Sequence, residues 1–203
     1  MNDTNIEQDP TLEGDISVEG GGVNDLRANN VSLQRGGARD VRANEVHITQ
    51  GGAQEVKATS VVVRQGGLQN VEADTVTVRQ GGIVQAKANN VSLTQGGIVL
   101  AQVDRANVTA GQVGLAYARD SLNLDQSIAR VVVSGGDVTL EQSGAGLLAA
   151  RRVKVENSGA LIVLAGRVDG QINAVFGPAA GALFGAVFGL VVALLLRLRR
   201  REG

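Results

Sequence analysis

A Gly-Gly pair recurs every fifteen residues along most of this chain, beginning at Gly21, Gly36, Gly51, Gly66, Gly81 and Gly96. Within each repeat, counting the first Gly as position one, apolar residues occupy positions three, six, eight, eleven and thirteen. A short exact period indicates a repeat architecture, in which each unit buries its apolar side chains by stacking on its neighbours. The fold must therefore be built from this unit.

The spacing divides each repeat into three short segments that read inward, outward, inward. Such alternation indicates a strand, and the polar pair that follows a segment, for example Asn89-Asn90, is typical of a corner. An amphipathic helix would need a 3.6-residue period, which these positions do not follow. The pattern therefore predicts an all-β fold, a triangular β-solenoid (β-helix) of about eleven 15-residue coils at roughly 4.8 Å per coil.

Polar residues also recur in register, and we expect them to stack. Position nine carries Asn or Asp in several repeats, residues that suit a turn. Position fifteen carries glutamines that predict an amide ladder: Gln50, Gln65, Gln80 and Gln95. Both columns are interpreted as structural.

The repeat defines the organisation of the chain. Residues 1–10 are predicted to be a mobile acidic leader, and residues 11–172 the β-solenoid domain. The unit that starts at Gly111 contains about two extra residues near 120–127, judged from where the pattern returns. The repeat is expected to resume at Ile128.

The composition changes after residue 172. Residues 174–196 carry no charge, and as a helix they would span about 34 Å, enough to cross a bilayer core. We therefore predict a single transmembrane helix over 173–196 and a basic tail over 197–203, with the membrane-flanking arginines Arg197, Arg199, Arg200 and Arg201. Four glycines spaced four apart form one stripe on this helix and predict a helix–helix interface: Gly177, Gly181, Gly185 and Gly189.

The repeats hold no arrangement from which we predict catalytic residues, a cofactor site or a metal site. The Gly pairs lack the Lys of a phosphate-binding loop, and the single histidine, His47, lies at an outward position. Lys and Arg (19) balance Asp and Glu (20), and the cations at position seven have no interleaved aromatics. These features favour a solvated surface over nucleic-acid binding. We therefore predict no enzyme activity, no nucleic-acid partner and no small-molecule substrate.

Positions four and five are polar in the first repeats and apolar in the later ones. This change predicts an outward apolar stripe, a candidate protein interface made of Val99, Leu100, Leu115, Val131, Val132, Leu147, Leu161 and Ile162. It lies toward the predicted membrane helix.

The alternating coils, the membrane-targeting terminus and the segment Arg167-Val-Asp-Gly-Gln-Ile172 resemble the bactofilins, bacterial β-helical proteins that polymerise without nucleotide. The segment is similar to their V-x-G-x-I rungs. The period here is shorter, and the anchor is C-terminal instead of N-terminal. The resemblance implies end-to-end assembly.

Together these features predict a non-enzymatic, membrane-anchored scaffold that forms a homo-oligomer or larger complex through the membrane helix, the solenoid, or both. The alternative is an accessory subunit that docks on another membrane complex through the apolar stripe. The N-terminus shows no signal peptide, which favours a cytoplasmic solenoid. The arginine tail favours the opposite topology, an extracytoplasmic solenoid with the tail inside.

Overall fold

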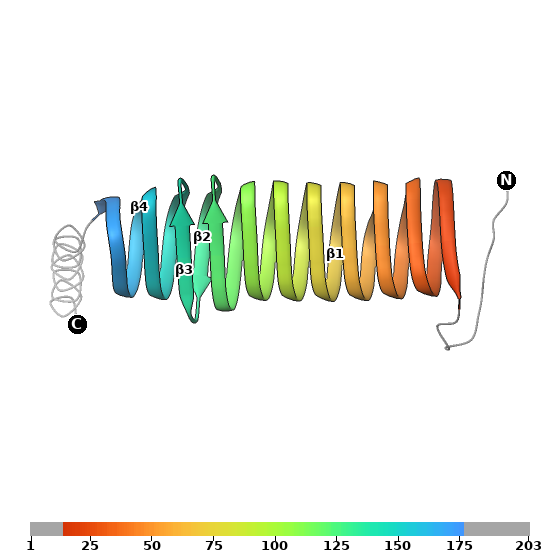
Figure 1. Cartoon of the computed structure of the whole chain (residues 1–203), viewed down its shortest axis with the longest axis horizontal. Helices are drawn as coiled ribbons and strands as arrows, with labels where there is room; N and C mark the ends of the chain where they lie inside the picture. The colour runs from red at the N-terminus through yellow and green to blue at the C-terminus, as the bar shows by residue number, and fades with distance from the viewer. Residues whose placement is uncertain (1–13, 177–203) are drawn as a thin grey trace, which may run out of the picture.

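The computed structural model describes residues 14–176, which wind into a straight rod of successive β-coils (Figure 1). The strands are β1 (Asp15–Asp125), β2 (Ile128–Ser134), β3 (Asp137–Glu141) and β4 (Gly144–Phe176). β1 and β4 are long because the chain stays extended through several coils. Every pairing between the four strands is parallel. The predicted all-β solenoid is therefore confirmed.

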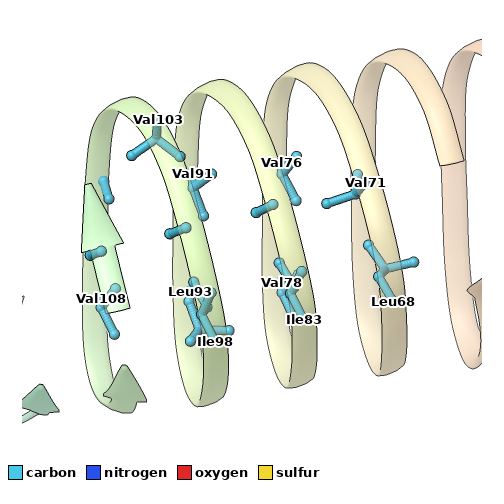
Figure 2. Packing of buried hydrophobic residues seen from close by; sticks show 14 of the residues in the cluster. Leu68, Val71, Val76, Val78, Ile83, Val91, Leu93, Ile98, Val103 and Val108 are labelled. Atoms are coloured by element: carbon cyan, nitrogen blue, oxygen red, sulfur yellow. The ribbon is translucent and has the colours of Figure 1, made fainter. Parts of the chain in front are cut away.

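Alternate side chains of each coil fill the interior of the rod. In one representative coil, Ile83, Ala86, Val91 and Leu93 are at most 3% exposed, and Ala88 is partly buried. Equivalent aliphatic side chains stack in rows from coil to coil (Figure 2). Burying one Val, Leu or Ile stabilises a fold by roughly 1.5–3 kcal/mol, so these rows are the main source of stability.

The two glycines of each pair have different surroundings. The φ angle lies between +142° and +159° at Gly51, Gly66, Gly81 and Gly96. A Cβ atom added to Gly81 would lie 1.7 Å from the carbonyl oxygen of Gly66 in the preceding coil. A Cβ atom added to Gly82 would lie 3.6 Å from the oxygen of Gly97, an ordinary contact. Coil packing therefore requires the first glycine of these pairs, whereas the second has room for a Cβ atom at Gly37, Gly67, Gly82 and Gly97 but not at Gly52, where it would lie 2.6 Å from the oxygen of Gly67.

Serine replaces the first glycine in the last coils. Ser127, Ser143 and Ser158 are buried, and each hydroxyl donates to the carbonyl oxygen two residues earlier at 2.7–2.8 Å. Each Oγ also accepts a hydrogen bond from the preceding coil, from the N–H of Gly111, Ser127 and Ser143 at 3.1, 3.0 and 2.9 Å. The serines form a continuous ladder in which the buried hydroxyls are satisfied.

The repeat length changes in two coils. β1 pairs with β2 at an offset of sixteen residues (Gln112 with Ile128), and β2 pairs with β4 at the same offset (Ile128 with Gly144). β3 pairs with β4 at fifteen (Asp137 with Arg152). One extra residue is therefore present in each of two successive coils, at the same corner, within 119–121 and 135–137.

This register corrects two predictions. The repeat resumes at Ser127, not at Ile128, because the two extra residues are shared between two coils. Val132, predicted to face outward, pairs with Ala116 at an inward position and is fully buried. The error arose because Val131, Val132 and Val133 are all apolar, so their order gives no alternation from which to place the register.

The described strands extend beyond the predicted domain end. β4 continues to Phe176, so residues 173–176 are strand where the sequence predicted the start of a helix. The predicted leader, the rest of the predicted membrane helix and the basic tail lie in 1–13 and 177–203, outside the described residues.

Candidate interaction surfaces

Amide ladders follow the corners of the rod. The predicted glutamine ladder is confirmed, with Nε2-to-Oε1 distances of 3.0–3.1 Å along Gln50, Gln65, Gln80 and Gln95. Single contacts of the same kind occur at the asparagine corner. The amide group of Asn44 donates to the side-chain oxygen of Asn29 at 2.6 Å, and that of Asn89 donates to a carboxylate oxygen of Asp74 at 3.0 Å. These contacts join neighbouring coils and are structural.

Several charged side chains are paired with a neighbour in the same or the adjacent coil. Lys57 lies 3.6 Å from Glu55 and 3.8 Å from Glu72, and Arg119 lies 3.3 Å from Asp104. Exposed pairs of this kind contribute about 0.2–1 kcal/mol each. They also neutralise the surface locally, so these corners present no extended field of one sign.

The single histidine is part of such a pair. His47 Nε2 lies 2.9 Å from a carboxylate oxygen of Glu45, and both side chains are about half exposed. No group of three or more His, Cys, Asp or Glu residues that could hold a metal ion lies within residues 14–176.

One column of charges is arranged differently. We call it the corner column: the residue at position fourteen, two before the next glycine or serine at position one, of the six coils that begin at Gly51 to Ser127, namely Arg64, Arg79, Thr94, Thr109, Asp125 and Glu141. The same position is occupied by Glu19, Gln34 and Thr49 in the preceding coils. The cations of the corner column lie in its N-terminal half and its acids in its C-terminal half, with two threonines between them. Among the described residues none of its four charges forms an ion pair.

The next acid along this line is engaged elsewhere. Glu156 pairs with Glu141 in the strand register, and its carboxylate lies 2.7 Å from the ammonium group of Lys154. The hydrogen bond and the charge of Glu156 raise the pKa of Lys154 above its ordinary value. The charge of Glu141 also raises the pKa of Lys154, but no cation in the described part of the chain lies within ion-pair distance of Asp125 or Glu141.

A long groove lies beside the corner column, on the face that carries the glycine pairs. We call it the glycine groove; its volume is about 1360 Å³, and it is lined by positions two to four of eight successive coils, from Gly22 to Arg130. Glycine forms its floor in the first six coils, whereas Gln112 and Ile128 take the floor position in the last two. Val84 and Val99 stand on its rim, 50% and 62% exposed, and Ile128 is 63% exposed.

The predicted apolar stripe is only partly exposed. Val99, Leu115, Leu161 and Ile162 are 40–62% exposed. Leu100, Val131 and Leu147 are half-buried, and Val132 belongs to the core. Exposed apolar side chains that the sequence did not single out are Val84, Tyr117, Ile128, Leu164 and Val168.

Seven of these exposed residues fall into two groups. Leu161, Ile162, Leu164 and Val168 lie together in the last coil of the rod, and Val84, Val99 and Ile128 line the glycine groove, whereas Leu115 and Tyr117 belong to neither group. Of these seven, Val99, Leu161 and Ile162 are the ones that the sequence predicts to face outward.

The predicted glycine stripe of the membrane helix and the flanking arginines lie outside the described residues. The part of the chain that the structure describes, residues 14–176, contains no helix long and apolar enough to cross a membrane.

Comparison of the chain with protein-family models, curated proteins and solved structures finds no match.

Proposed function

We propose that this protein is a non-enzymatic, membrane-anchored scaffold: a triangular β-solenoid of about eleven coils, held at the bilayer by a C-terminal transmembrane helix over 177–196. One observation carries the proposal. Leu161, Ile162, Leu164 and Val168 are 40–62% exposed in the last coil, directly before an uncharged run that ends in an arginine cluster. Exposed apolar residues of this density mark a contact with lipid or with another protein.

The surface and interior of the rod support the proposed scaffold role. Its corners carry amide ladders and local ion pairs, and its interior is filled with aliphatic side chains. We propose that it forms a homo-oligomer, through the glycine stripe of the membrane helix, through the solenoid, or through both. The bactofilin resemblance is consistent with assembly of rods.

Membrane anchoring is tested by flotation of the full chain in a lipid gradient. Leu183→Arg with Val187→Arg places two charges in the uncharged run, each costing about 2.5–3.5 kcal/mol at the centre of a membrane helix. We expect the wild-type chain to float with vesicles and the variant to stay at the bottom. The matched control, Arg27→Glu with Arg42→Glu on the rod, should still float. A wild-type chain that fails to float contradicts the anchor.

Assembly is tested on the detergent-extracted chain by size exclusion and negative-stain imaging. A scaffold should give rods joined in regular oligomers or filaments. A single rod without self-association would contradict the scaffold role.

The exposed residues of the last coil also support a second candidate, an accessory subunit that docks on a different membrane complex. Leu161→Ser with Ile162→Ser should then abolish co-purification of a foreign protein in a fixed ratio, while any homo-oligomer persists. Ser replacement of Leu100, which is half-buried, is a less specific test, and replacement of Val132 would damage the core.

For topology we propose that the solenoid is cytoplasmic, with the extracytoplasmic orientation as the alternative. Protease added to intact cells should leave the solenoid undigested. Digestion would reverse the assignment.

A further inference from the structure

We propose that two copies of this chain associate side by side and antiparallel, through the face that carries the glycine groove and the corner column. This inference deepens the proposed self-association by naming the surface, the register and the residues that meet.

The first argument is the order of charges in the corner column. Along the rod it reads Arg64, Arg79, Thr94, Thr109, Asp125, Glu141, one residue per coil. A two-fold axis perpendicular to the rod, passing between the coils of Gly81 and Gly96, brings the column of one copy against the inverted column of the other. Arg79 then meets Asp125, and Arg64 meets Glu141. A shift by one coil in one direction leaves a single contact of this kind, Arg64 with Asp125. In the other direction Arg79 meets Glu141, and Arg64 meets Glu156, whose carboxylate already lies beside Lys154.

The second argument is that these charges are available. Arg64, Arg79 and Glu141 are exposed and Asp125 is partly buried. None of them forms an ion pair inside the described chain, in contrast to Lys57, which lies near two carboxylates of its own corner. Since the axis generates each pair twice, the dimer contains four ion pairs. Complementary charges of this kind fix register and orientation in an interface.

The third argument is steric, and it comes from the floor of the glycine groove. The same axis places Ile128 of one copy opposite Gly52 of the other, and Gln112 opposite Gly67. The two floor residues with side chains therefore face glycines, which leave space for them. Ile128 is 63% exposed in the single rod and would be covered in the dimer.

The centre of the interface is apolar. Val84 and Val99, the two exposed valines of the groove rim, lie in the coils on either side of the axis, so each meets the other residue of the second copy. The glutamines at position fifteen are compatible with the same register, because Gln80 meets Gln126 and Gln65 meets Gln142. An apolar centre flanked by polar and charged pairs is the usual anatomy of a protein interface.

The length of the groove is sufficient for a specific interface. Under the proposed axis the two grooves face each other over six coils, which extend roughly 29 Å at about 4.8 Å per coil. A strip of this length and about 20 Å in width, the face with its two corners, gives roughly 580 Å² per partner and about 1,160 Å² in total, above the roughly 1,000 Å² expected of a specific interface.

A parallel arrangement does not satisfy the same observations. A two-fold axis along the rod would place the corner column of one copy against position four of the other, so Arg79 would meet Gln69 and Asp125 would meet Gly114. The charges would then remain unpaired.

Disulfide crosslinking of the full chain tests the arrangement, since the chain has no native cysteine. Thr49 and Glu156 are exposed on the same corner and meet across the proposed axis. A mixture of Thr49→Cys and Glu156→Cys copies should form a disulfide-linked dimer. Each variant alone should not, because identical residues would lie seven coils, or about 34 Å, apart. A mixture that fails to crosslink overturns the proposal.

Charge exchange then tests the corner column with the same readout. Arg64→Glu with Arg79→Glu, placed in the Thr49→Cys copy, should lower the crosslink yield at least about tenfold. Asp125→Arg with Glu141→Arg in the Glu156→Cys copy should restore it. Arg27→Glu with Arg42→Glu is the matched control, two equal charge reversals on another face, and should leave the yield unchanged. An unchanged yield in the first variant would overturn the charge pairing.

Two controls distinguish a failure of the proposed dimer from misfolding of a variant and from a failure of the proposed membrane anchor. Unchanged circular dichroism of each variant shows that the rod is folded. Flotation of the same samples reports on the anchor: floating protein without the crosslink refutes the dimer alone, and crosslinked protein that does not float refutes the anchor alone.

Discussion

The two glycines of a pair differ in whether the neighbouring coil leaves space for a side chain. The first glycine of a pair faces the carbonyl oxygen of the coil before it, and its φ angle is one that other residues rarely adopt. The second faces outward and in most pairs, as at Gly82, leaves room for a methyl group. The sequence alone does not show which of the two glycines the coil packing requires, because both recur every fifteen residues.

Gly81→Ala should therefore destabilise the rod by about 3 kcal/mol, because the new methyl group clashes with the oxygen of Gly66 and the backbone is strained. Chemical denaturation followed by circular dichroism measures the change in the free energy of unfolding. The adjacent variant Gly82→Ala is the control and should change it by less than about 1 kcal/mol. Equal losses in the two variants would contradict the coil packing described here.

The serine ladder allows a second test. Ser143→Ala removes the Oγ that accepts the N–H of Ser127, and this buried donor would lose its partner. We expect a loss of about 1–3 kcal/mol in the free energy of unfolding. Ser92→Ala, at a partly buried outward position, should cost much less. A neutral Ser143→Ala would mean that water or another group replaces the hydroxyl.

At the scale of the element, the sequence was sufficient wherever the alternation was clean. It predicted the inward positions of the first seven Gly-led coils and the glutamine ladder, because Gly pairs and Gln mark each corner. It was insufficient between Arg119 and Gln142, where three consecutive valines and a glycine pair at the wrong corner obscure the register. Only hydrogen bonding between coils decides there which residues stack.

The candidate surface was missed for the same reason. A strict fifteen-residue count places Leu124 at position fourteen and moves Asp125 off the corner column. Once the sixteen-residue offset is known, the order of Arg, Thr and acid can be read directly from the chain.

The corner at which the extra residues lie predicts where insertions are tolerated. One glycine inserted after Asn89, at the equivalent corner, should reduce the free energy of unfolding by about 1 kcal/mol or less, since two coils already carry such a residue. One inserted after Ile83 should prevent cooperative folding, because later side chains of that segment exchange the interior for the surface. Thermal melts of both variants compare them; identical melting curves would refute the inward assignment.

At the scale of the whole molecule, association of the proposed membrane helix is a separate question from association of the rod. Gly181→Leu with Gly185→Leu should block close approach of two helices, although each such contact in lipid contributes only about 1 kcal/mol. The measurement is disulfide formation in membranes between chains that carry Leu196→Cys. We expect the disulfide when the glycine stripe is intact, and we expect its loss when Gly181→Leu and Gly185→Leu are added.

Ala182→Leu with Ala186→Leu adds the same bulk on a neighbouring stripe and should leave that disulfide intact. If both pairs of substitutions acted alike, the glycine stripe would not be the contact.

The two ends of the described rod lie far apart (Figure 1), so an antiparallel pair would carry its membrane segments at opposite ends. Such a pair would lie along one bilayer or connect two bilayers at a fixed separation. The coil is also a unit of length, since each repeat adds the same rise. Inserting a whole coil between Thr94 and Thr109 moves the axis by half a coil and leaves every charge with its partner. Two chains of equal length would therefore form all of the charge pairs, whereas two chains that differ by one coil would form the pairs at only one end. The spacing of the charges would thus make association selective for rods of equal length.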